Sequence, residues 1–298
     1  MIRNDAPLTR RAFLQTCVAL LGVPALIRPQ LPSSDPGRPA EVWVCPMDPD
    51  VRSSQAGVCP RCGMKLLQHV PEAVEYRLEV TQSPQGARPG QRVTFVIRVL
   101  DPVSGQPVHH FELVHEKLMH LFVVSENLEF FAHEHPDPQP DGSFRQSLQL
   151  PLGGMYRMLA DFYPSGSVPQ LLPKTIFVVG KSAPAELVPS FAPAKSQNLT
   201  AALALEPAQP LAGLTTRMFF TVDPAAGLEP YLGAWGHLLA VSDDLVDFLH
   251  LHPFLADGGP VIQFNVIFPR PRLYRLWVQF QRHGVVNTGV FTVAAKAL

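Results

Sequence analysis

A long internal repeat constrains the fold of this chain more than any other feature of its sequence. Residues 120–136 recur without a gap, 117 residues later, as residues 237–253, and both copies keep three histidines at the same places. Farther along, residues 156–162 recur as residues 274–280. A repeat of this length indicates two copies of one domain, each with its own core.

Each copy is typical of short strands joined by turns. The chain has 32 prolines in 298 residues, about twice the usual ~5%, and this argues against long helices. Apolar residues alternate in 92–100, as in a strand with one buried face. Tyr156 and Tyr274 open a late strand after a turn, which resembles the tyrosine corner of immunoglobulin-like domains. We expect a mainly β fold, with a small cysteine-rich knuckle followed by two repeated antiparallel β-sandwiches, immunoglobulin-like or cupredoxin-like.

The amino-terminal residues are typical of an export signal. Arg10 and Arg11 precede an apolar run at 17–27, which is too short for the ~20 residues that span a bilayer. The arginine pair followed by Phe-Leu resembles a twin-arginine signal. We expect a periplasmic or secreted protein without a mature transmembrane segment; an uncleaved amino-terminal anchor is the alternative. The predicted segments are a signal (1–25), a linker (26–41), the knuckle (42–70), the first sandwich (72–181), a Pro/Ala/Ser-rich linker (182–197) and the second sandwich (198–296).

Charge and motifs exclude several function classes. The 24 Lys and Arg against 25 Asp and Glu leave a net charge of −1, whereas a nucleic-acid binder carries a basic excess or stripe. The sequence also lacks a nucleophile elbow, a phosphate-binding loop, a dinucleotide-binding glycine motif and a His-Glu-x-x-His zinc motif. We therefore expect no nucleic-acid partner and no enzymatic activity.

The cysteines predict a metal site. Apart from Cys17 in the signal, the chain has three cysteines, and an odd number cannot be fully paired within one chain in an oxidising compartment. Cys59 and Cys62 are two residues apart and are followed by glycine, while Cys45 and Asp48 repeat that spacing. Two such half-sites supply three thiolates and a carboxylate, a set that suits tetrahedral Zn²⁺.

The same segment resembles the heavy-metal-binding domain attached to copper and silver efflux ATPases and to periplasmic efflux adaptors. The match rests on Trp-x-Cys-Pro-Met-Asp-Pro and Gly-x-Cys-Pro-x-Cys-Gly-Met within 42–68. The resemblance implies metal-binding roles for Cys45, Met47, Cys59, Cys62 and Met64. Asp48 stands where that family usually has histidine, and its harder carboxylate favours zinc over Cu(I) or Ag(I). A purely structural zinc knuckle is the alternative.

The repeated histidines predict a second, weaker pair of sites. If residues 120–136 form a hairpin with a two-residue loop at 126–127, His120 lies opposite His133, and His237 lies opposite His250 in the second copy. The candidate ligands for Cu²⁺ or Zn²⁺ are His120, His133 and His135 in the first copy and His237, His250 and His252 in the second. The alternative is that these histidines are polar plugs, hydrogen-bonded to the backbone at strand ends. The first copy has a surplus of histidines just upstream, at 109, 110 and 115.

Together these features predict a non-enzymatic, extracytoplasmic protein that binds copper, zinc or silver in buffering, delivery or resistance. Its expected partners are metal ions and a metal efflux system or a metalloprotein client. Two alternatives are open: an adhesion or interaction protein with a structural zinc knuckle, and a copper or zinc enzyme that uses the histidines. The repeat also resembles secreted β-sandwich proteins of unknown role.

Overall fold

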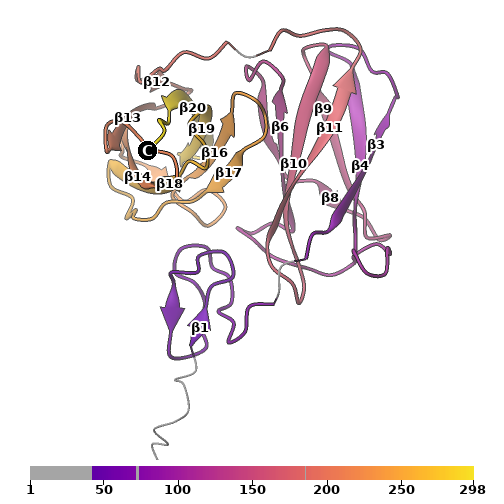
Figure 1. The fold of residues 1–298 in the computed structure, drawn as a ribbon, viewed down its shortest axis with the longest axis horizontal. Helices are drawn as coiled ribbons and strands as arrows, with labels where there is room; N and C mark the ends of the chain where they lie inside the picture. The colour runs from indigo at the N-terminus through magenta and orange to yellow at the C-terminus, as the bar shows by residue number, and fades with distance from the viewer. Residues whose placement is uncertain (1–41, 72–73, 185) are drawn as a thin grey trace, which may run out of the picture. The chain divides into compact units, whose positions relative to one another are not determined.

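The computed structural model describes residues 42–71, 74–184 and 186–298. The described chain is built from strands β1 to β20 and contains no helix (Figure 1). The mainly β fold is therefore confirmed. It follows that no described segment is a helix long and apolar enough to cross a membrane. The signal and linker predicted at 1–25 and 26–41, with Cys17, lie outside the described residues.

The cysteine-rich segment is a small two-stranded unit. Its strands β1 (Trp43–Val44) and β2 (Arg52–Ser53) pair antiparallel. The chain then returns to this ribbon, because Val44 and Leu67 form an antiparallel bridge. A buried cluster that includes the three cysteines supplies the core of this unit.

The first repeat is a sandwich of two antiparallel sheets. One sheet has the order β3-β4-β9-β8, and the other has the order β11-β10-β6-β7 with β5 paired to β10. The strands of the first sheet are β3 (Arg77–Ser83), β4 (Arg92–Leu100), β8 (Asp137–Pro138) and β9 (Phe144–Gln149). Those of the second are β5 (Phe111–Glu112), β6 (Met119–Ser125), β7 (Phe131–Glu134), β10 (Gly154–Pro164) and β11 (Gln170–Val178). The alternation predicted within 92–100 is confirmed, because Val93, Phe95, Ile97 and Val99 are buried in the core between the sheets.

The second repeat forms the same kind of sandwich. Its sheets have the orders β12-β13-β14-β18 and β15-β19-β16-β17, with β20 paired to β19. The strands of the first are β12 (Ala194–Lys195), β13 (Thr200–Glu206), β14 (Thr215–Asp223) and β18 (Val261–Ile267). Those of the second are β15 (Leu228–Glu229), β16 (His237–Ser242), β17 (Phe248–Leu251), β19 (Leu273–Arg282) and β20 (Val285–Ala294). The expected repetition of one sandwich is confirmed.

Both repeats contain the tyrosine corner that the sequence predicted. The Tyr156 hydroxyl donates to the Leu152 carbonyl at 2.9 Å and accepts from the Leu152 amide at 2.9 Å. The Tyr274 hydroxyl accepts from the Arg270 amide at 3.2 Å, and its one hydrogen has two acceptors in reach, the Arg270 carbonyl at 3.0 Å and Asp247 Oδ2 at 2.7 Å. Each buried hydroxyl therefore closes the turn that leads into its strand.

The predicted register of the histidine hairpins is wrong by two residues. His133 lies opposite Phe122 rather than His120, and His250 lies opposite Leu239 rather than His237. The loop is longer than expected: the Ser125 amide donates to the Phe130 carbonyl at 3.2 Å, which encloses four residues instead of two. A shift of two positions keeps every side chain on its face of the sheet, so the histidines still converge.

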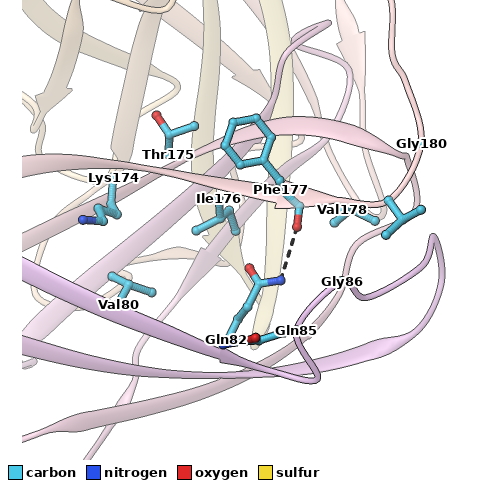
Figure 2. Close-up of a pocket in the computed structure, with 11 residues that line it drawn as sticks. Val80, Gln82, Gln85, Gly86, Lys174, Thr175, Ile176, Phe177, Val178 and Gly180 are labelled. Carbon is cyan, nitrogen blue, oxygen red and sulfur yellow. Dashed lines mark hydrogen bonds between the residues drawn. The ribbon is translucent and has the colours of Figure 1, made fainter.

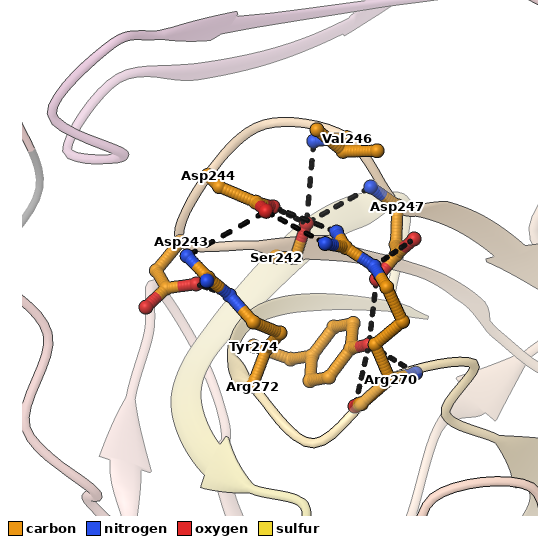
Figure 3. Close-up of polar contacts among 8 residues, drawn as sticks. All are labelled: Ser242, Asp243, Asp244, Val246, Asp247, Arg270, Arg272 and Tyr274. Carbon is orange, nitrogen blue, oxygen red and sulfur yellow. Dashed lines mark hydrogen bonds and ion pairs between the residues drawn. The ribbon is translucent and has the colours of Figure 1, made fainter.

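A network of charged groups supports this hairpin in the second repeat (Figure 3). Arg270 donates to Asp244 at 2.8 Å and to Asp247 at 3.0 Å, and Arg272 donates to Asp243 at 2.7 Å. These aspartates belong to the turn between β16 and β17. The network therefore ties that turn to the loop before β19.

The central strands β6 and β16 are buried on both faces. In β6, Leu121 and Val123 face the core of their own sandwich, while Phe122 and Val124 belong to a separate apolar cluster with Leu239, Val241 and Trp277 of the second repeat. The two repeats therefore share an apolar interface, and the histidines lie along the same faces of these strands.

A cavity of about 480 Å³ opens at the edge of the first sandwich, between β3 and β11 (Figure 2). Gln82 Nε2 bridges the two edges by donating to the Phe177 carbonyl at 3.3 Å. The described lining of the cavity contains one ionisable side chain, Lys174. The side chains that could ligate a metal lie elsewhere.

Candidate metal centres

The cysteine centre forms where three short backbone segments meet. Cys45 directly follows β1, and Cys59 and Cys62 lie in a turn that is closed when the Gly63 amide donates to the Cys59 carbonyl at 2.9 Å. Gly63 has a φ of 72°, which glycine adopts without strain. One ligand atom from each of Cys45, Asp48, Cys59 and Cys62 lies within 4.8 Å of the others. The structure thus brings together the four residues that the spacing predicted.

No disulfide links the three described cysteines. The Sγ atoms of Cys45 and Cys62 are 3.4 Å apart, and Cys59 Sγ lies 3.3 Å from Asp48 Oδ2, whereas a disulfide bond is ~2.05 Å long. The hydrogen bond from the Cys62 thiol lowers the pKa of Cys45 to about 6. Burial raises the pKa of Cys59 to about 11, and the hydrogen bond with Cys45 raises that of Cys62. Cys45 is therefore the thiol of the cluster that ionises first.

Arg61 fixes the carboxylate of the centre. Its guanidinium donates to Asp48 Oδ1 at 3.3 Å, also pairs with Asp50, and lies over the ring of Phe254 at 4.6 Å. The other oxygen, Asp48 Oδ2, faces Cys59. Partners of this kind commonly orient metal-binding carboxylates.

Both methionines of the segment lie in the apolar cluster around the cysteines. Met64 is buried there, and Met47 packs against it from a half-buried position; Val114 and Tyr163 of the first sandwich belong to the same cluster. Their role as metal ligands, which the resemblance implies, stays a prediction.

The histidines form two clusters at the interface between the sandwiches. In the first, ligand nitrogens of His120, His133 and His135 all lie within 4.8 Å of one another, as the sequence predicted. The second differs from the prediction: the corresponding set contains His115 with His237 and His252. His250 lies beside it, with its ring centroid 4.6 Å from that of His252.

His115 is the candidate ligand that the sequence reasoning did not assign to a site. It comes from the first repeat, where residue 109 and residue 110 of the same surplus are exposed. A turn carries it toward the second repeat, and its ring centroid lies 3.6 Å from that of His252. The surplus of histidines upstream of His120 pointed to this region of the sequence. Only the contact between the repeats shows which of these histidines joins a cluster.

The repeats match a known family. Residues 72–176 and 194–297 each match the model of the family described as "Domain of unknown function (DUF8832)". The chain belongs to the DUF8832 family. Residues 42–69, ahead of the two DUF8832 repeats, match the family described as "Heavy metal binding domain".

Solved structures similar to the DUF8832 chain include bacterial adhesins and immunoglobulin domains of titin, and no curated protein matches it. The Escherichia coli adhesin FdeC is 14% identical, with a TM-score of 0.27 over 78% of this chain and 68% of that one. Invasin, a bacterial integrin-binding protein, is 15% identical, with a TM-score of 0.24 over 74% and 40%. An ice-binding adhesin of an Antarctic bacterium is 7% identical, with a TM-score of 0.25 over 76% and 50%.

Burial favours the neutral form of six of the histidines between the DUF8832 repeats. Desolvation lowers the pKa of His115 and of His120 to about 4 and that of His135 to about 3. It also lowers the pKa of His133, His237 and His252 well below the usual value. Neutral imidazole is the form that binds a metal, so these side chains can act as ligands at neutral pH.

Proposed function

We propose that this protein is a non-enzymatic, extracytoplasmic metal-binding protein that holds one Zn²⁺ or related heavy-metal ion in its cysteine centre, for buffering, delivery or resistance. The observation that carries the proposal is the convergence of three thiol sulfurs and one carboxylate oxygen within 4.8 Å, in a segment that matches a heavy-metal-binding family.

The donor set favours zinc. Three thiolates and a carboxylate match the four-coordinate sites of Zn²⁺, whereas Cu(I) and Ag(I) prefer sulfur donors alone or with imidazole. A dication would also offset the negative charge of the thiolates, and so allow Cys59 and Cys62 to ionise beside Cys45. Zinc binding should therefore release protons.

Metal analysis tests the proposal. Full-length protein purified without chelator should carry zinc, and the Cys59→Ser/Cys62→Ser double variant should carry one ion fewer per chain. Met47→Leu is the matched control for the identity of the metal, because Zn²⁺ does not need a thioether and Cu(I) would lose a soft donor. Unchanged metal content in the double cysteine variant would refute the proposal.

The partial burial of the centre against the first sandwich supports a second candidate, a structural zinc knuckle in an interaction protein. The cysteines share an apolar cluster with Val114 and Tyr163, so the ion also holds the segment against that sandwich. If the ion is structural, chelation should lower the melting temperature sharply, and a competing metal acceptor should remove it only as the segment unfolds. If it is cargo, the acceptor should remove it from a protein that stays folded.

Export and the lack of catalysis have separate tests. Arg10→Lys/Arg11→Lys should keep the protein inside the cell if the twin-arginine signal is used, and cell fractionation measures this. Oxygen consumption or hydrolysis by the metal-loaded protein would favour the enzyme alternative instead.

A further inference from the structure

The polar end of the interface between the repeats contains seven histidines. They are His115, His120, His133 and His135 of the first repeat and His237, His250 and His252 of the second. Three of these, His115, His120 and His237, are at most 5% exposed. Burying so many imidazoles costs free energy unless their nitrogens find partners.

In both repeats, one histidine is oriented by a backbone carbonyl. His120 Nε2 lies 2.9 Å from the Val114 carbonyl, and His237 Nε2 lies 2.9 Å from the Tyr231 carbonyl. A carbonyl can only accept, so Nε2 carries the hydrogen in both rings and Nδ1 keeps its lone pair. Each bond satisfies one of the two ring nitrogens, as a polar plug would, and leaves the other nitrogen with a free lone pair.

A second histidine in each repeat is oriented by the opposite repeat. His133 Nδ1 lies 2.6 Å from Gln279 Oε1, and His250 Nδ1 lies 2.5 Å from Asp161 Oδ2. Gln279 uses its Nε2 toward Thr288 Oγ1 at 3.3 Å, which leaves Oε1 as the acceptor. In both rings Nδ1 is thereby occupied, and Nε2 is the nitrogen left to bind a metal. Metal-binding histidines are commonly oriented in this way, by a carboxylate or amide on the far nitrogen.

The bare nitrogens face one another. His120 Nδ1 and His133 Nε2 are 3.0 Å apart, close to the ~3.3 Å between two nitrogens bound at ~2.05 Å to one tetrahedral ion. Within the described chain, five more imidazole nitrogens are buried with no hydrogen-bond partner: Nε2 of His115, His135, His250 and His252, and Nδ1 of His237. Buried polar atoms without partners are uncommon. A cation bound between these nitrogens would supply the partner that they lack.

We propose that the interface is a second metal centre that binds two transition-metal ions of the copper or zinc kind, one in each histidine cluster. His120, His133 and His135 hold one ion, and His115, His237 and His252, with His250 beside them, hold the other. An all-imidazole set suits Cu²⁺ and Zn²⁺ and lacks the sulfur that favours the softest ions. Because each cluster depends on groups from both repeats, the ions also clamp the two sandwiches together.

Each cluster has a cavity beside it through which an ion can enter. One of about 220 Å³ is lined by His135, and one of about 130 Å³ is lined by His250 and His252. The second cavity is also lined by Met47 and Asp48 of the cysteine segment. An entry path is one requirement of a real metal site.

Counting ions in the full chain tests the proposal independently of the cysteine centre. In the Cys59→Ser/Cys62→Ser background, Zn²⁺-loaded and dialysed protein should hold two ions per chain. Adding His135→Ala or His252→Ala should leave one ion, because each removes a ligand from one cluster. Adding His110→Ala, an exposed histidine outside both clusters, should leave two.

A spectroscopic measurement covers the case in which the histidine variants do not fold. Rings of the two clusters lie close together, with His120 and His237 centroids 6.0 Å apart. Two Cu²⁺ ions bound there should give a spin-coupled electron paramagnetic resonance signal with nitrogen hyperfine structure. The protein measured is the Cys59→Ser/Cys62→Ser variant, which keeps all its histidines. Fewer than two ions per chain, an uncoupled signal at two equivalents, or equal loss of metal in His110→Ala would overturn the proposal.

Discussion

The stacked pair of Phe131 and Trp277 allows a direct test of the interface between the repeats. Phe131 belongs to β7 and Trp277 to β19; their ring centroids are 5.1 Å apart and the ring planes 10° from parallel. Trp277 is 2% exposed. Such aromatic pairs contribute about 0.5–1.5 kcal/mol beyond the area they bury. We predict a coupling free energy of about 1 kcal/mol between Phe131→Leu and Trp277→Leu.

The assay is a double-mutant cycle on the metal-free protein. Urea unfolding of the parent, both single variants and the double variant gives four free energies, and each single variant should lose about 1–3 kcal/mol. The double variant should lose less than the two single variants together, because the contact between the rings is lost only once. Phe111 and Phe144, a pair within the first sandwich at 5.2 Å, supply a positive control that does not depend on the interface.

Additivity at Phe131 and Trp277 would refute this reasoning. If the two losses add to within about 0.5 kcal/mol while the control pair shows coupling, the rings do not touch in solution. The repeats would then not share this face, and the histidine centre would lose the structure that assembles it.

Asp161→Ala should weaken metal binding by the cluster of the second repeat about 10–100-fold, and Gln279→Ala should do the same to the first, as measured by competition with a zinc chelator. The metal-free protein should lose stability as the pH falls from about 6.5, because the pKa values of His115 and His120 are about 4 when folded and about 6.5 when unfolded. By pH 5 the unfolded state gains protons over about 1.5 pH units at ~1.4 kcal/mol per unit, or about 2 kcal/mol for each histidine, and urea unfolding at pH 7.5 and 5 measures this. Tyr156→Phe should lower the free energy of unfolding by about 1–2 kcal/mol in urea, because it leaves buried backbone groups without their partner.

The sequence predicted the features that depend on local periodicity and spacing. The alternating strand at 92–100 and the tyrosine corners follow from short-range patterns, and the repeat follows from self-similarity at an offset of 117 residues; the structure has all three. The convergence of His120, His133 and His135 was also predicted, although the loop was assigned the wrong length. It survived because an error of two residues preserves which face a strand residue occupies.

Contacts between the repeats could not be predicted from the sequence. The apolar run in β6 indicates a strand buried on both faces, but it does not say that the second face meets β16 and Trp277. The use of His115 and the cross-repeat partners Asp161 and Gln279 depend on that meeting. Nothing within its own repeat marks any of these three residues as part of a metal site. Each joins the site only through its contact with the other repeat.

Asp161 and Gln279 occupy equivalent places, opposite His120 and His237 in their sheets, yet one is a carboxylate and the other a neutral amide. The duplicated halves are therefore not interchangeable. The negative charge beside His250 makes that ring the better electron donor and offsets an incoming cation, while His133 has only a dipole behind it. We expect a fixed order of filling, in which the half that contains His250 takes its ion at the lower free concentration.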